Sequence, residues 1–314
     1  MTSGVARVGD VDLAYQVEGP RGAPALVFAG SLGTTATMWA PQVLALRGRY
    51  RTVTYDARGH GSSGAPAGPY TVADLGGDVV GLLDTLGIAR ASLCGLSLGG
   101  MAAMWVAAHA PDRVDRLVLA CTAPELGPAA RWIERAAAVR ASGTAAIFPA
   151  LAPRWFTPEF AIEHGDVLDG IEAMLVSCSD EGYASCCEAI ATMDLADDVR
   201  TISAPTLVIA GAADPVTPPA VALALALAIP GASLAVIPGA SHLANLEQPA
   251  RFTAALDAHL GGDAAERGAA ARRAVVGDAH VDRAERQTTG LTAANAAFAA
   301  ARESLDSLGE EDPR

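Results

Sequence analysis

Gly95-Leu96-Ser97-Leu98-Gly99 has the pattern Gly-x-Ser-x-Gly, and its surroundings decide the fold class that the sequence predicts. The apolar residues 91–96 are typical of a buried strand, and the small apolar residues 98–110 are typical of a packed helix. A serine at such a strand-to-helix turn has its hydroxyl exposed above the sheet, because the flanking glycines leave room for a sharp turn. Ser97 is therefore the candidate nucleophile.

Strand and helix signals alternate on both sides of this motif. Strands are predicted at 11–18, 25–29, 52–55, 116–121, 206–210 and 233–237, and further helices at 72–86, 220–228 and 252–260. Strands that alternate with helices of this length are typical of βαβ units. The predicted fold class is α/β, with helices flanking a mostly parallel central sheet.

Two segments depart from this alternation. Residues 123–195 have helical spacing, with helices predicted at 129–141, about 160–178 and 183–193, and we interpret them as a helical lid on a core of residues 1–122 and 196–262. Residues 263–314 hold ten acidic residues and seven arginines but few large apolar side chains. Such a segment has too little apolar surface for its own core, so we expect a partly helical or disordered tail.

Composition excludes several classes of function. The chain of 314 residues has a net charge of −13 and no lysine, which rules out Schiff-base and Ser-Lys chemistry. Basic residues do not cluster, so neither nucleic acid nor an anionic membrane surface is an expected partner. The longest apolar run, residues 219–229, is too short to span a membrane.

The cysteines and the N-terminus indicate a cytoplasmic protein. Five cysteines at irregular spacing form neither a CxxC pair nor a zinc pattern, so buried free thiols and no metal are expected. The first residues also lack the apolar stretch of a signal peptide.

A serine hydroxyl needs a general base and an orienting carboxylate. His242 follows the last predicted strand and Asp214 follows the strand before it, so the order is Ser, Asp, His, as expected for this type of turn. The other histidines lie in a glycine-rich turn, near helix ends, in the insertion or in the tail. Other carboxylates remain as alternatives to Asp214, namely Glu125, Asp194, Asp197 and Asp198.

Two backbone amides are candidates for an oxyanion hole. Leu98 directly follows the nucleophile, and Leu32 lies in the Gly30-Ser31-Leu32-Gly33 loop after the strand at 25–29. The alternative is that Gly30 and Gly33 only form a tight turn. Residues 56–62 follow another strand, and we interpret Asp56 and His60 there as parts of a hydrogen-bonded structural turn.

These motifs resemble those of the α/β-hydrolase superfamily. The resemblance rests on residues 30–34 with Met38 and Trp39, on residues 56–61 and on the Ser97 turn. Within the superfamily the chain resembles the 3-oxoadipate enol-lactonases of the β-ketoadipate pathway, at residues 132–136, 154–158, 182–184, 193–195 and 242–249. The likeness covers roughly residues 8–260. One departure is Gly30, where the family usually has asparagine.

The resemblance implies hydrolysis of an enol-lactone to 3-oxoadipate by the Ser97–His242–Asp214 triad, without a cofactor. The free carboxylate of such a substrate pairs well with a guanidinium group. Candidate substrate-binding residues are Ser31, Trp132, Trp155 and the arginines Arg131, Arg135 and Arg154. Two alternatives remain open: a general carboxylesterase or perhydrolase with the same triad, and a non-catalytic ligand-binding member of the superfamily.

The tail carries a second resemblance. Residues 272–284, with Thr288 and Thr289, are similar to the start of 4-carboxymuconolactone decarboxylase, and the likeness fades after about residue 298. This implies a truncated remnant without decarboxylase activity. Docking of a separate decarboxylase through the tail and assembly into a homo-oligomer both stay open.

Overall fold

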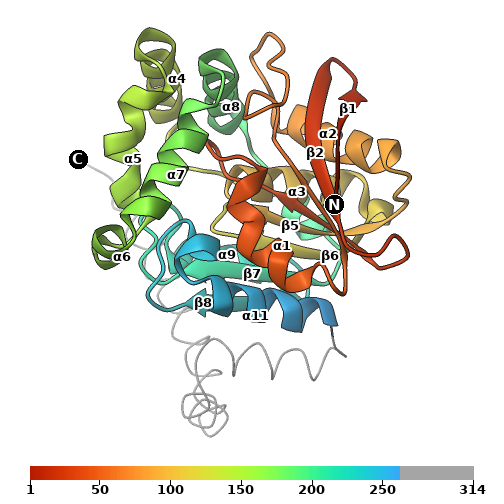
Figure 1. The fold of residues 1–314 in the computed structure, drawn as a ribbon. Coiled ribbons are helices and arrows are strands. Elements are labelled where there is room, and N and C mark those ends of the chain that lie inside the picture. Colours follow the sequence, from red (N-terminus) through yellow and green to blue (C-terminus); the bar gives the residue numbers. More distant parts are fainter. Residues whose placement is uncertain (262–314) are drawn as a thin grey trace, which may run out of the picture.

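The computed structural model describes residues 1–261, in which eight strands form one sheet in the order β1-β2-β4-β3-β5-β6-β7-β8 (Figure 1). The strands are β1 (Thr2–Val8), β2 (Val11–Glu18), β3 (Ala25–Ala29), β4 (Arg51–Tyr55), β5 (Ala91–Leu96), β6 (Val114–Ala120), β7 (Thr206–Gly211) and β8 (Ser233–Ile237). β2 pairs antiparallel with both β1 and β4, and every other pairing is parallel. The predicted tail, residues 263–314, lies outside the described residues.

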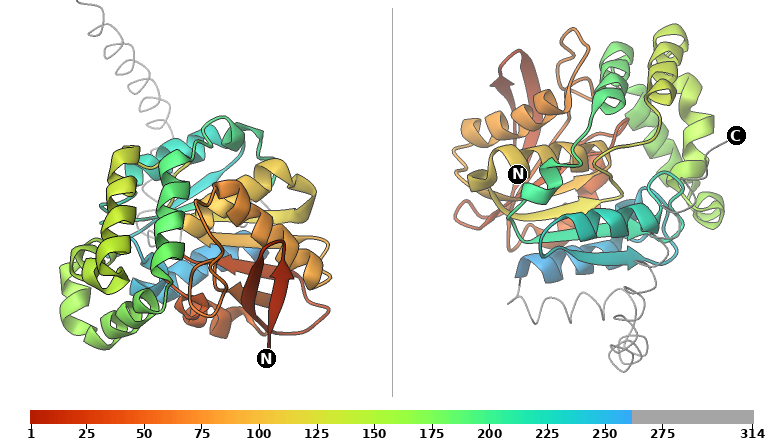
Figure 2. Two further views of the ribbon diagram at one scale, coloured as in Figure 1. Left: turned by 90° about the horizontal axis from the view of Figure 1, so that it is seen from above. Right: turned by 180° about the vertical axis from the view of Figure 1, so that it is seen from behind.

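Helices cover both faces of the sheet. α1 (Ala40–Leu46) and α11 (Pro249–Gly261) lie on one face, and α2 (Val72–Thr85), α3 (Leu98–His109) and α9 (Pro219–Ala228) lie on the other (Figures 1 and 2). The predicted fold class, α/β with a mostly parallel sheet and flanking helices, is thus confirmed. None of the helices in residues 1–261 is both long and apolar enough to cross a membrane.

Five helices connect β6 to β7 and gather at one side of the molecule (Figures 1 and 2). We call them the helical insertion: α4 (Ala129–Ser142), α5 (Phe148–Trp155), α6 (Pro158–Glu163), α7 (Gly165–Val176) and α8 (Asp180–Thr192). The single helix predicted at about 160–178 is wrong. α6 ends at Glu163 because His164 leaves the helical region at φ −129° and ψ 51°, and a new helix begins at Gly165.

The edge strand β1 and helix α1 were not predicted from the sequence. β1 pairs with β2 along its whole length, yet Ala6 is its only fully buried residue. Backbone pairing at a sheet edge therefore fixes this strand, rather than the burial of alternate side chains that makes strands visible in a sequence.

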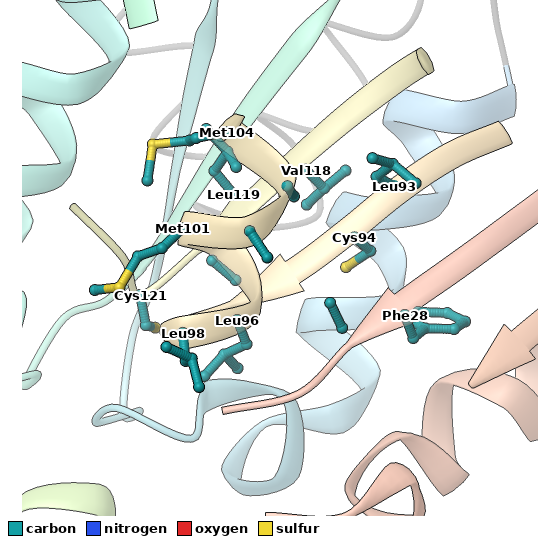
Figure 3. Close-up of a cluster of buried hydrophobic side chains, with 14 of the residues drawn as sticks. Phe28, Leu93, Cys94, Leu96, Leu98, Met101, Met104, Val118, Leu119 and Cys121 are labelled. Atoms are coloured by element: carbon teal, nitrogen blue, oxygen red, sulfur yellow. The ribbon is translucent and has the colours of Figure 1, made fainter. Parts of the chain in front are cut away.

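The centre of the core lies where α3 packs on β5 (Figure 3). All six residues of β5 are buried, and α3 also buries most of its residues, including Met101 and Met104. Small side chains on α3 allow this helix to approach the sheet closely. The turn at Ser97, which joins these two elements, is therefore held between two closely packed, buried elements.

A buried ion pair fixes the loop after β4 to helix α2. Arg58 donates two hydrogen bonds of 2.7 Å to the Asp78 carboxylate, from Nε and Nη2. Both side chains are almost fully buried, whereas Asp10, the second acid near Arg58, is largely exposed. The pair anchors the turn that begins at Arg58 and contains His60.

We expect Asp78→Ala to lower the free energy of unfolding by about 3–5 kcal/mol, because it leaves the buried Arg58 guanidinium without its main partner. Denaturant unfolding would measure the change. Asp12→Ala is the matched control, because it removes an exposed pair with Arg7 and should cost no more than about 1 kcal/mol. Equal effects of the two substitutions would contradict the assignment of Asp78 as a structural anchor.

Candidate active site

Ser97 occupies a strained turn between β5 and α3, with φ 54° and ψ −115°. The glycines on both sides permit it. A Cβ atom on Gly95 would lie 2.2 Å from the Gly99 carbonyl oxygen, and one on Gly99 would lie 2.2 Å from the Ala29 carbonyl oxygen. The Gly-x-Ser-x-Gly pattern is therefore a steric requirement of this turn, which projects Ser97 from the end of the central strand.

The His242 ring meets a carboxylate from the neighbouring loop. His242 Nδ1 lies 2.9 Å from Asp214 Oδ2, and both side chains are buried. Asp214 also accepts hydrogen bonds from the amides of Val216 and Thr217 and from the Thr217 hydroxyl. Although burial opposes the charge, the His242 imidazole and the hydrogen bonds from His242 and Thr217 hold the pKa of Asp214 below its ordinary value. A charged Asp214 accepts a hydrogen bond from Nδ1–H, which leaves His242 Nε2 unprotonated and free to act as a base.

One cavity brings most of the predicted site residues together. It is lined by Ser31, Leu32, Ser97, Trp132, Arg135, Leu151, Arg154, Trp155, Tyr183, Val216 and His242. Asp214 lies behind His242, and Arg131 is not among the lining residues. The hydrogen bonds found in residues 1–261 do not include one between Ser97 Oγ and His242. Catalytic hydrogen bonds of this kind often tighten only when substrate is bound.

Two backbone amides near this cavity donate no hydrogen bond within residues 1–261. The amide of Ser31 contacts the Met38 sulfur, that of Gly33 donates to His60 Nε2, and that of Gly99 donates to the Gly30 carbonyl. Among the hydrogen bonds of the described residues, the amides of Leu32 and Leu98 are not donors. These are the two amides predicted for an oxyanion hole; Leu32 lines the cavity, and Leu98 directly follows the lining residue Ser97.

His60 supports the loop of residues 30–33 through a hydrogen bond. Its Nε2 accepts the Gly33 amide at 2.9 Å, and its Nδ1 lies 3.0 Å from the Arg58 carbonyl oxygen, so the ring is the neutral Nδ1–H tautomer. Asp56 accepts hydrogen bonds from the amides of Ala36 and Ser62. Both residues thus have the structural hydrogen bonds that the sequence suggested for this turn.

Cys121 completes the one group among the described residues that could ligate a metal. Its sulfur and one ligand atom each of Asp214 and His242 lie within 4.8 Å of one another. Metal ligation requires a thiolate, but burial raises the pKa of Cys121 well above its ordinary value. Asp214 already accepts four hydrogen bonds. The arrangement therefore fits a hydrogen-bonded His–Asp pair better than a metal centre.

Two arginines, Arg135 and Arg154, line the cavity, and Arg131 adds positive charge near them. Arg135 lies over the Trp132 ring, with its Cζ 4.5 Å from the ring centroid. Burial, followed by repulsion from Arg131 and Arg135, lowers the pKa of Arg154. Asp214 attracts Arg154 and partly offsets this repulsion, but the salt bridges of residues 1–261 include none of the three arginines. Such a cluster favours an anionic ligand.

Sequence reasoning missed three residues that line the cavity, Leu151, Tyr183 and Val216. Leu151 lies in the unpredicted helix α5, and Val216 lies just beyond Asp214. Only Tyr183 had a signal, because it belongs to one of the motifs that carry the family resemblance. Glu247 was also missed as a functional candidate, although it lies in the motif that contains His242.

The strain at Ser97 should be visible in stability. We expect Ser97→Gly to be about 1 kcal/mol more stable than Ser97→Ala, because both lack the hydroxyl but only glycine adopts this φ and ψ without strain. Chemical unfolding of the two variants would measure the difference. If the alanine variant were the more stable, the turn could not be strained as described.

The buried His60 predicts a pH effect on stability. Burial lowers the pKa of His60, against smaller opposing effects of the Arg58 carbonyl and Asp56. As the pH falls through about 6.5, the unfolded chain gains a proton that the folded chain does not, so stability is lost. His60→Gln keeps an acceptor for the Gly33 amide but removes this titration. We therefore expect unfolding free energies at about pH 7.5 and 5.5 to differ less in the variant than in the wild type. Equal differences would exclude a depressed His60 pKa.

Comparisons with known proteins agree with this geometry. The model of the alpha/beta hydrolase family matches residues 26–255. A 3-oxoadipate enol-lactonase of Acinetobacter baylyi is 43% identical, and the match covers 79% of this chain and 93% of that protein. The crystal structure of the enol-lactonase from Burkholderia xenovorans superposes with a TM-score of 0.81 at 43% identity, covering 82% of this chain and all of that one. A thermophilic esterase of Thermogutta terrifontis gives a TM-score of 0.78 at 30% identity, covering 83% of this chain and 98% of that one. The strained serine turn, the sheet topology and these matches together place the chain in the alpha/beta hydrolase family.

Proposed function

We propose that this chain hydrolyses 3-oxoadipate enol-lactone to 3-oxoadipate, as a step of the β-ketoadipate pathway of aromatic catabolism. The observation that carries the proposal is the presence of Arg135 and Arg154 in the same cavity as Ser97 and His242. The substrate combines a reactive lactone carbonyl with a free carboxylate, and the cavity has groups for both. The names of the 40–43% identical relatives support the same substrate.

Acylation begins with attack of the Ser97 oxygen on the lactone carbonyl. His242 Nε2 takes the hydroxyl proton, and charged Asp214 stabilises the resulting imidazolium through Nδ1. The amides of Leu32 and Leu98 donate to the oxygen that becomes negative. The ring C–O bond then breaks, and the leaving enolate is protonated by His242 to an enol that becomes a ketone.

Deacylation releases the product. The acyl carbon of the opened lactone is now bonded to the Ser97 oxygen as an ester. Because the acyl group and the leaving group belong to one molecule, no fragment leaves the site at this stage. His242 takes a proton from water as the water attacks this ester, and then returns a proton to the Ser97 oxygen. Hydrolysis gives 3-oxoadipate and free enzyme, with water as the only other reactant.

The arginines would bind the substrate carboxylate at a distance from the reacting bond. Arg154 is the better candidate, because Arg135 already contacts the Trp132 ring, whereas Arg154 is partly buried beside two like charges. Arg131 does not line the cavity and would act only through its field. The five cysteines are free and buried, which accords with the cytoplasmic location that we expect for such an enzyme.

A carboxylesterase of the same fold is the second candidate. It is favoured by the 30% identical esterase structure and by the apolar side chains of Trp132, Leu151 and Trp155 in the cavity. Such an enzyme would hydrolyse neutral esters without a need for the arginines. The two candidates therefore differ in how strongly turnover depends on a carboxylate in the substrate.

The test is hydrolysis of 3-oxoadipate enol-lactone, generated in situ, by wild type, Ser97→Ala and Arg154→Gln. We expect Ser97→Ala to lose on the order of 10⁴-fold or more in kcat. Arg154→Gln should raise KM about 10- to 100-fold with a smaller change in kcat, because a charge-assisted hydrogen bond remote from the reacting bond is lost. A folded wild type that hydrolyses 4-nitrophenyl esters but not the lactone would favour the carboxylesterase.

A further inference from the structure

The helical insertion is joined to the His242 loop at one corner. Residues 154–157, at the end of α5, lie against residues 241–247, which follow β8 and include the short helix α10 (Ala244–Glu247). The Leu243 amide donates to the Trp155 carbonyl at 3.0 Å, and the Ser241 hydroxyl donates to the Arg154 carbonyl at 3.1 Å. We call this set of contacts the corner clamp.

Glu247 lies at the centre of the corner clamp. Its carboxylate Oε1 accepts the Thr157 amide at 2.9 Å and also the Thr157 hydroxyl, while Oε2 accepts the Ser241 amide at 2.6 Å. The residue is only 4% exposed. Each oxygen of one buried carboxylate thus binds a different side of the junction, one the insertion and the other the loop that carries the histidine.

The residues that Glu247 binds on the two sides, Ser241 and Thr157, are close in sequence to residues that line the cavity. Ser241 directly precedes His242, and Thr157 lies two and three residues beyond Trp155 and Arg154. His242, Trp155 and Arg154 all line the cavity. A displacement of the insertion at this corner would therefore move the arginine relative to the base.

We propose that Glu247 is a positioning residue that holds Arg154 at a fixed distance from His242 and so sets the preference for substrates with a carboxylate. This inference deepens the proposed function and rests on it for the identity of the natural substrate. Glu247 touches neither substrate nor the reacting atoms. It acts through Thr157 on the insertion and through Ser241 on the histidine loop.

A purely structural role makes a different prediction. If the corner clamp served only stability, weakening it would lower the unfolding temperature and reduce turnover of all esters alike. If it positions Arg154, weakening it reduces turnover of carboxylate-bearing esters more than that of neutral ones. The informative quantity is the ratio of kcat/KM for two esters that differ only in the carboxylate.

Mono-4-nitrophenyl adipate and 4-nitrophenyl hexanoate form such a pair, because both have a six-carbon acyl chain and the same leaving group. Thr157→Val removes the hydroxyl donor to Glu247 but keeps the shape and the backbone amide. We expect it to lower the adipate-to-hexanoate ratio about tenfold, which corresponds to the loss of about 1.4 kcal/mol of discrimination. Thr157→Ser, which keeps the hydroxyl, should restore the wild-type ratio. Glu247→Gln should lower the ratio as well, because an amide cannot accept from both sides.

Ser179→Ala is the matched control. Thr157 also caps α6 by accepting the Phe160 amide, and Ser179 caps α8 in the same way by accepting the Gly182 amide. Within residues 1–261, the hydrogen bonds of Ser179 go to Gly59 and Gly182 and not to the histidine loop. Its loss should therefore lower stability without changing the ratio, which separates the removal of a helix cap from the loss of the corner clamp.

The decisive comparison adds Thr157→Val to Arg154→Gln. If Glu247 acts through the arginine, the valine substitution causes no further fall in the ratio in this background. A ratio unchanged by Thr157→Val, a parallel loss on both esters, or an additive effect in the double variant would each overturn the inference. Because the ester pair does not depend on the lactone, failure to hydrolyse the lactone would overturn only the proposed function.

Discussion

Close contact between Gly99 and the backbone of Ala29 and Gly30 underlies the whole site. The Gly99 amide donates to the Gly30 carbonyl at 2.9 Å, and a Cβ atom on Gly99 would lie 2.2 Å from the Ala29 carbonyl oxygen. Only a glycine lets the first turn of α3 approach the end of β3 this closely. The approach brings the turn that carries Ser97 and Leu98 beside the loop that carries Leu32, and Ser97 and Leu32 line the same cavity.

The whole chain is negatively charged, but the cavity that would bind an anionic substrate contains arginines. The chain has a net charge of −13, which repels anions at long range. Screening limits that field to about 8–10 Å at moderate ionic strength. Within the cavity, Arg135 and Arg154 are reinforced by Arg131, which repels Arg154, whereas Asp214 attracts Arg154. An anion bound there offsets the repulsion among the arginines, so a substrate carboxylate is attracted to the cavity.

Local patterns explain which parts could be predicted from the sequence. β3, β5 and β8 have the predicted bounds because each is a compact apolar run, and Ser97 stood out because its turn needs glycines at fixed positions. β1 was missed because it depends on edge pairing. The predicted site residues other than Asp214, Leu98 and Arg131 line one cavity, since loops that follow parallel strands converge at one edge of the sheet. The contact between Thr157 and Glu247 joins residues 90 positions apart and leaves no local pattern.

The corner clamp explains how an insertion can contribute precise groups to a site built by the core. A buried carboxylate is tolerated only while its donors are in place, because removing one leaves charge without compensation. Glu247 takes its donors from both partners, so separation of the insertion from the histidine loop would strip one of its oxygens of hydrogen bonds. The energetic cost of opening this corner is therefore high. The same hydrogen bonds that satisfy Glu247 and Ser241 therefore keep Arg154 and Trp155 in place relative to His242.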